Sequence, residues 1–224
     1  MIPALREKGA WVHVDGAFGL WAQASKKFSH LSRGVEAADS WATDGHKWLQ
    51  TPYDCGYAIV RNELAHRRAM TIAASYLPLA AEGERDPSHY VPELSRRARG
   101  FATWAMLKHL GRDGIAALID QCCASARLLG EHLQRERGIT ILNEITLNQL
   151  ILRFAADRPE DESDAITRKT IAKIRDDATL FAGGAKWRGR DVLRLSVTNF
   201  QTTADEARLA ADSIIAAFRS VSRG

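Results

Sequence analysis

The sequence predicts an α/β domain that is followed by a small α+β domain. Three short apolar segments, at Trp11–Val14, Ala38–Ala42 and Cys55–Val60, are separated by turns and by helix-compatible stretches, which is a spacing typical of α/β proteins. After a long alanine-rich helix the pattern changes to a second mixture of strands and helices. We therefore expect residues 1–118 to form part of a large domain and residues 119–224 to form a small one.

The first expected strand ends at an aspartate. Trp11–Val14 combines β-branched and aromatic residues, and Asp15 follows it directly, at the carboxyl end where open α/β sheets bind ligands. Ala17 comes two residues later, so its side chain is expected on the same side of an extended chain as that of Asp15.

The second and third expected strands flank a basic pair. Ala38–Ala42 runs into a Thr-Asp-Gly turn, and His46 and Lys47 follow this turn. Cys55–Val60 is nearly continuous in its apolar content, which predicts an interior strand.

Helices and strands are expected in the rest of the chain as follows. Proline and glycine predict a loop over Tyr76–Glu93, and Gly111 is expected to end the helix before it. Four apolar residues from Ile171 to Phe181 fall on one helix face, and Thr203 with Glu206 forms a capping box. The expected helices are Ser95–Leu110, Asp113–Arg137, Ile166–Phe181 and Ala204–Phe218, and the expected strands are Ile139–Leu142, Gln149–Phe154 and Val192–Val197.

The composition is that of a globular protein, with 46% hydrophobic and 26% charged residues. No leader precedes residue 20, and no apolar run approaches the roughly 18 to 20 residues of a membrane span, so no membrane interaction is expected. Three cysteines are too few for a disulfide framework, and Cys122 and Cys123 have no histidine at ligand spacing. We expect a cytoplasmic protein without a metal site.

A short basic cluster is formed by Arg96, Arg97 and Arg99, in a chain whose net charge is +4. No aromatic platform or nucleic-acid motif accompanies the cluster, and 27 acidic residues balance 31 basic ones. An ion-paired helix start is the favoured interpretation, a site for an anionic substrate is the second, and no nucleic-acid partner is expected.

An amine, a carboxylate and a small residue in this arrangement predict a site for pyridoxal 5'-phosphate. That cofactor needs an amine to form a Schiff base, a carboxylate beside its pyridine nitrogen and a cradle for its phosphate. Lys47 can supply the amine and Asp15 the carboxylate, while Ala17 is small enough for a flat ring to lie against it. His46 can reach the phosphate or a substrate carboxylate. Further possible phosphate donors are Ser40 and Thr43.

Several motifs resemble the group II pyridoxal-dependent amino-acid decarboxylases, a family that includes the aromatic amino-acid, histidine and glutamate decarboxylases. The resemblance covers nearly the whole chain and corresponds to the carboxy-terminal half of the family. The motifs that carry it are His13–Gly19, Ala38–Ser40, His46–Leu49, Tyr53–Gly56, Leu94–Arg97 and Leu193–Val197.

The resemblance implies a fold-type I enzyme, with a large domain around a mostly parallel sheet and a small carboxy-terminal domain, that works as a homodimer in amino-acid metabolism. By the same resemblance Lys47 is the Schiff-base lysine, Asp15 the partner of the pyridine nitrogen, Ala17 the residue packed on one ring face and His46 a neighbour of the phosphate. The implied reaction is decarboxylation of an L-amino acid to an amine and carbon dioxide.

The sequence departs from the family in three respects. The family's amino-terminal half, with the histidine that stacks on the other ring face and much of the phosphate loop, is absent. Many members carry an asparagine at the position of Asp44. Pro87 aligns with a catalytic tyrosine of the family's mobile loop, and Tyr90 could replace that tyrosine as proton donor only if the loop shifts by three residues.

Two alternatives to a decarboxylase stay open. Aminotransferases and cysteine desulfurases share the fold and the roles of the aspartate and the lysine, although the Tyr-Asp-Cys-Gly segment at residues 53–56 favours a decarboxylase. A non-catalytic truncated remnant is the second alternative, because half of the usual cofactor domain is missing and the decarboxylase is expected to be incomplete as this chain alone.

Overall fold

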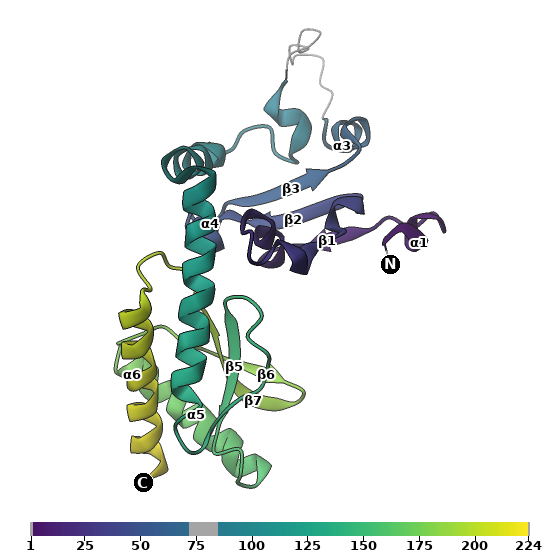
Figure 1. Cartoon of the computed structure of the whole chain (residues 1–224). Helices are drawn as coiled ribbons and strands as arrows, with labels where there is room; N and C mark the ends of the chain where they lie inside the picture. The colour runs from purple at the N-terminus through teal and green to yellow at the C-terminus, as the bar shows by residue number, and fades with distance from the viewer. Residues whose placement is uncertain (1, 72–84, 224) are drawn as a thin grey trace. The chain divides into compact units, whose positions relative to one another are not determined.

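The computed structural model of the chain describes residues 2–71 and 85–223 (Figure 1). The first part of the loop expected at Tyr76–Glu93 lies outside the described residues. Its remainder contains a single 3₁₀ turn, η4 (Pro87–Tyr90), which begins after Asp86.

The chain divides into two compact units. The first unit contains Met1–Gln23 and Ser29–Gly111, and the second contains Ala24–Phe28 and Arg112–Gly224. The expected domain boundary between residues 118 and 119 stays a prediction.

The first unit is built on a three-stranded sheet with the order β1-β2-β3 (Figure 1). β1 (His13–Asp15) is parallel to β2 (Ser40–Asp44), and β2 is antiparallel to β3 (Gly56–Val60). The expectation of an interior third strand is wrong for the described part of the chain, because β3 pairs with β2 alone and Ile59 is 47% exposed.

The parallel pairing brings the carboxyl ends of two strands to the same edge of this sheet. Asp15 is opposite Ala42 in the register, and the N–H of Gly16 continues the pairing by donating to the Ala42 carbonyl at 2.8 Å. α2 (Gly45–Trp48) begins directly after β2. The residues that follow β1 and the whole of α2 are therefore positioned at one edge.

Short helical elements surround the sheet. Asn62 caps α3 (Glu63–Met70) by accepting a hydrogen bond from the N–H of Ala65 at 3.0 Å, which satisfies one of the free donors of the first turn. The remaining elements of this kind are α1 (Ile2–Arg6), η1 (Gly19–Ala24), η2 (Ser29–Ser32) and η3 (Val35–Ala37).

A glycine interrupts the long helix α4 (Arg99–Leu133). Gly111 has φ 61° and ψ −174°, a backbone conformation that side chains disfavour and glycine adopts freely. The sequence correctly placed a helix break at Gly111, whereas the helix begins at Arg99 and not at Ser95.

The second unit packs helices on a four-stranded antiparallel sheet with the order β4-β5-β7-β6. Its core includes the stacked rings of Phe154 and Phe218, whose centroids are 5.1 Å apart. The elements are β4 (Ile139–Ile141), β5 (Gln149–Phe154), α5 (Glu160–Asp176), β6 (Gly183–Trp187), β7 (Arg190–Ser196) and α6 (Ala204–Ser222).

One expectation for the second unit needs correction, and one is confirmed. Helix α5 ends at Asp176, so Ala178 and Phe181 lie beyond it and do not extend its buried face; Phe181 is 91% exposed. The hydroxyl of Thr203 accepts a hydrogen bond from the N–H of Glu206 at 3.4 Å, as the capping box predicted. No helix in the described residues is long and apolar enough to cross a membrane.

Candidate active site

Asp15 offers an exposed carboxylate at the end of β1. Its Oδ1 accepts a hydrogen bond from the N–H of Ala17 at 3.2 Å, which turns the chain away from the sheet. This is the carboxylate's one hydrogen bond within residues 2–71 and 85–223. Its second oxygen is therefore available to a ligand.

The amine of Lys47 is half-buried and has two neighbours. Its Nζ atom lies 2.6 Å from Oδ2 of Asp44, the last residue of β2, and 4.4 Å from the centroid of the Phe18 ring. An aromatic face attracts a cation, so both neighbours stabilise a charged amine at this point.

Phe18 fastens the segment after β1 to α2. Its carbonyl accepts a hydrogen bond from Trp48 Nε1 at 3.1 Å, and the two rings meet edge to face with centroids 6.5 Å apart. Because Phe18 follows Asp15 by three residues and Trp48 follows Lys47 directly, this contact brings the carboxylate-bearing turn and the lysine-bearing helix together.

His46 presents a ring nitrogen without a partner. Its Nδ1 is buried and makes no hydrogen bond to any described residue. Its ring contacts Tyr53, with centroids 4.4 Å apart. Buried polar atoms are nearly always hydrogen-bonded, so an unpaired one on the helix that carries Lys47 suits a site that receives a polar ligand.

The hydroxyl groups of Ser40 and Thr43, which the sequence offers as phosphate donors, are already engaged. Thr43 Oγ1 donates to the Gly16 carbonyl at 2.9 Å. Ser40 Oγ lies 2.9 Å from Trp11 Nε1 and 2.8 Å from His13 Nδ1. Both groups serve the pairing of β1 with β2.

Tyr90 is held by α3. Its hydroxyl donates to Glu63 Oε1 at 2.6 Å, and its ring meets His66 edge to face at 5.6 Å. The hydrogen bond to Glu63 raises the pKa of the Tyr90 hydroxyl. Tyr90 lines a cavity of about 1140 Å³ beside β3 that Asp15, Ala17, His46 and Lys47 do not line. Its role as proton donor stays a prediction.

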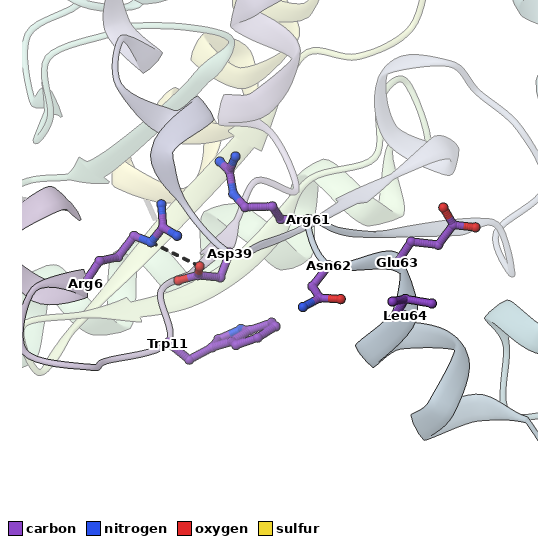
Figure 2. A pocket seen from close by; sticks show the side chains of 7 residues that line it. All are labelled: Arg6, Trp11, Asp39, Arg61, Asn62, Glu63 and Leu64. Atoms are coloured by element: carbon purple, nitrogen blue, oxygen red, sulfur yellow. Dashed lines mark ion pairs between the residues drawn. The ribbon is translucent and has the colours of Figure 1, made fainter.

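A second pocket of about 480 Å³ opens near the amino ends of β1 and β2 (Figure 2). Its charged groups already have partners in the protein: Arg6 Nε lies 3.2 Å from Asp39 Oδ1, Arg61 Nε donates to the Ala38 carbonyl at 2.8 Å, and Glu63 accepts from the Tyr90 hydroxyl. These contacts serve the fold, so we place the candidate site at the other edge of the sheet. The lining residues are Arg6, Trp11, Asp39, Arg61, Asn62, Glu63 and Leu64.

Neither Phe18 nor Tyr53 was singled out as a site residue from the sequence. Both lie inside the motifs that carry the family resemblance, and that position is the one signal that could have identified them. Periodicity could not, because each aromatic ring contacts a residue of another element or loop.

Comparison with protein families gives a match to the pyridoxal-dependent decarboxylase conserved domain over residues 1–155. The chain belongs to the pyridoxal-dependent decarboxylase family. This membership confirms the resemblance seen in the sequence motifs.

Curated relatives in the decarboxylase family are similar over most of this chain. The aromatic-L-amino-acid decarboxylase of Bacillus atrophaeus is 26% identical, over 89% of this chain and 43% of its own length. The enzyme of the same name from Sus scrofa is 26% identical, over 95% of this chain and 43% of its own length. The L-2,4-diaminobutyrate decarboxylase of Rhizobium meliloti is 27% identical, over 92% of this chain and 42% of its own length.

Solved decarboxylase-family structures confirm the expected fold. Oryza sativa TDC with PLP and tryptamine superimposes with a TM-score of 0.87 at 23% identity, over 98% of this chain and 46% of that one. Mouse CSAD superimposes with a TM-score of 0.85 at 21% identity, over 96% of this chain and 47% of that one. The chain thus spans less than half the length of these decarboxylase-family relatives.

Proposed function

We propose that this chain carries the lysine-bearing part of a pyridoxal-phosphate-dependent amino-acid decarboxylase and that Lys47 binds the cofactor. The observation that carries the proposal is the position of the Lys47 amine, which lies over the ring of Phe18 at the sheet edge where Asp15 ends β1. An amine and a carboxylate brought together at the carboxyl ends of parallel strands suit a ligand with an aldehyde and a basic ring nitrogen.

The residues of the site have separate tasks in this proposal. Lys47 holds the cofactor covalently, and Asp15 accepts a hydrogen bond from the ring nitrogen. A charge-assisted hydrogen bond of that kind contributes about 1.5–3 kcal/mol. Ala17 leaves room for the ring, and His46 Nδ1 provides a hydrogen bond to the phosphate. When bound, pyridoxal phosphate supplies an electron sink for the bond that is broken at the substrate's α-carbon.

The proposed reaction is decarboxylation of an L-amino acid to an amine and carbon dioxide by a cytoplasmic homodimer. Curated relatives with different printed activities match this chain equally well, at 26% for aromatic-L-amino-acid decarboxylases and 27% for an L-2,4-diaminobutyrate decarboxylase. The proposal therefore names the amino-acid class and no single substrate.

Covalent capture of the cofactor tests the central claim. Pyridoxal phosphate is added to the purified chain, the adduct is reduced with borohydride, and the modified lysine is located by peptide mass mapping. We expect the label at Lys47 and its loss in Lys47→Arg, with no change in Lys186→Arg, which replaces an exposed lysine of β6. Label that persists in Lys47→Arg contradicts the proposal. No capture at any lysine favours a non-catalytic remnant.

Product analysis separates the possible reactions. We expect carbon dioxide release from at least one amino acid of a panel, without formation of a keto acid. Formation of a keto acid would indicate an aminotransferase, and release of sulfur from cysteine would indicate a desulfurase. Asp15→Asn should weaken both cofactor retention and turnover, because its amide cannot stabilise a protonated ring nitrogen as a carboxylate does.

A further inference from the structure

Gly45, the first residue of α2, is closely enclosed. Its N–H donates to the Cys55 carbonyl at 3.0 Å, and its own carbonyl accepts from the N–H of Thr51 at 3.3 Å. A Cβ at this position would lie 2.4 Å from the hydroxyl oxygen of Tyr57 and 2.5 Å from Thr51 Oγ1. The Tyr57 hydroxyl thus lies directly against the backbone from which the Lys47 turn starts.

The hydroxyl of Tyr57 belongs to a small polar network. It lies 2.7 Å from Thr103 Oγ1, in the part of α4 that belongs to the first unit. Cys55 Sγ donates to the Tyr57 hydroxyl at 3.6 Å and lies 3.3 Å from Thr103 Oγ1. The three groups can close a ring of hydrogen bonds in which each donates once.

The ionisation behaviour of the network agrees with this arrangement. Burial raises the pKa of Tyr57 to about 12, so its hydroxyl remains a donor at neutral pH. Burial acts to raise the pKa of the Cys55 thiol as well, but its hydrogen bonds with Thr103, Thr51 and Tyr57 outweigh burial, and the pKa lies below its ordinary value.

An exposed ionic contact also joins the loop before β3 to the start of α4. The carboxylate of Asp54 accepts hydrogen bonds from Arg97 and from Arg99, whose Nε lies 3.1 Å from Asp54 Oδ2. The loop that leads into β3 is therefore joined to the beginning of α4 by a buried polar contact and by an exposed ionic one.

We propose that Tyr57 and Thr103 are positioning residues that fix Gly45 and thereby the direction in which Lys47 leaves α2. The proposal rests on the proposed role of Lys47 in binding the cofactor. Neither residue needs to touch the cofactor, since both act through Gly45. If they served packing alone, phenylalanine and valine would replace them without effect on the Lys47 turn.

Amide hydrogen exchange on the cofactor-free chain tests the contact itself. Tyr57→Phe and Thr103→Val should each accelerate exchange at the N–H groups of Gly45 and Thr51 by about 5-fold, the effect of losing one net hydrogen bond. Thr103→Ser keeps the hydroxyl and should restore protection. Thr140→Val, the same change on an exposed strand of the second unit, should leave both amides unchanged. If Tyr57→Phe and Thr103→Val lower the melting temperature but leave exchange at the Gly45 and Thr51 amides unchanged, the proposal is overturned.

Cofactor affinity provides the second measurement. Each single variant should weaken pyridoxal phosphate binding about 5-fold, and the double variant should be no weaker than either single one, because both remove the same contact. Full affinity in both single variants overturns the positioning role. If the unmodified chain captures no cofactor at Lys47, the proposed function fails, and the exchange measurement still decides whether Tyr57 and Thr103 fix Gly45.

Discussion

The Nζ atom of Lys47 lies 2.6 Å from Oδ2 of Asp44, three residues earlier in the chain. The motifs of this region resemble a family in which many members carry an asparagine at the position of Asp44. Here the additional negative charge is paired with the lysine that we propose binds the cofactor. Asp44 therefore holds the amine in an ion pair, which has to open before the amine can attack an aldehyde.

Replacement of Asp44 by asparagine should accelerate cofactor capture at neutral pH. A partly exposed ion pair contributes up to about 1 kcal/mol, so the expected gain in rate is about 5-fold or less. The rate of adduct formation at Lys47, measured by borohydride trapping, provides the check.

The control for this experiment is Asp205→Asn, which breaks the i, i+3 ion pair between Asp205 and Arg208 on α6. It should leave the capture rate unchanged. A capture rate in Asp44→Asn that equals or falls below that of the unmodified chain would show that Asp44 does not restrain the amine.

Gly45→Ala should destabilise the chain. The added methyl group has no room beside the Tyr57 hydroxyl, and overpacking of this kind costs about 1–3 kcal/mol of unfolding free energy. Chemical denaturation measures the loss. Gly100→Ala is the matched control, since nothing lies within 4 Å of a Cβ there and alanine favours a helix. Equal stability of the two variants would contradict the packing described for Gly45.

Cys122 and Cys123 should resist alkylation in the folded chain. Burial raises the pKa of Cys122 to about 11 and that of Cys123 to about 12, so neither forms the reactive thiolate at neutral pH. Mass spectrometry after iodoacetamide treatment should show no modification of these two residues until denaturant is added. Rapid labelling of either residue in the native chain would contradict this expectation.

A glutamate–arginine pair should make part of the stability of the second unit sensitive to acid. Arg219 donates to Glu136 from Nε at 2.8 Å and from a terminal nitrogen at 2.6 Å, and this contact holds the pKa of Glu136 below its ordinary value. Because the folded-state pKa is the lower one, the stabilisation is present above the ordinary glutamate pKa and is lost as the pH falls through the lowered value.

Glu136→Gln should therefore unfold more easily than the unmodified chain at neutral pH, by about 1 kcal/mol or less, and the difference should shrink in acid. Urea denaturation at several pH values measures it. Glu131→Gln, at an exposed position of α4, is the control and should show no such pH dependence. A difference that grows toward acid would reverse the assigned sign.

The position of the candidate site could be predicted because it depends on local patterns. The β-branched run ends at Asp15, and a glycine turn precedes His46 and Lys47. Both patterns place these residues after strands and require no knowledge of tertiary contacts. The parallel register of β1 and β2 then brings them to one edge. The same local logic identified the helix break at Gly111.

The remaining features depend on contacts that no short window of sequence contains. Thr43 and Gly16 are 27 residues apart, and their hydrogen bond removes a hydroxyl that looked free for a phosphate. The apolar content of β3 suggested an interior strand, but the position of a strand in a sheet is set by its partners. Helix periodicity continues past Asp176, although Ala178 has a φ of 52° and cannot extend α5.

The buried, unpaired Nδ1 of His46 affects the balance between the free and loaded forms of the protein. An unsatisfied buried polar atom costs about 1–3 kcal/mol, and the empty chain bears that cost alone. A ligand that supplies the missing hydrogen bond removes this cost, and the same amount of free energy then contributes to its affinity. Ligand binding should therefore raise the melting temperature by more than covalent attachment at Lys47 alone would, because it also removes the cost of the unpaired nitrogen of His46.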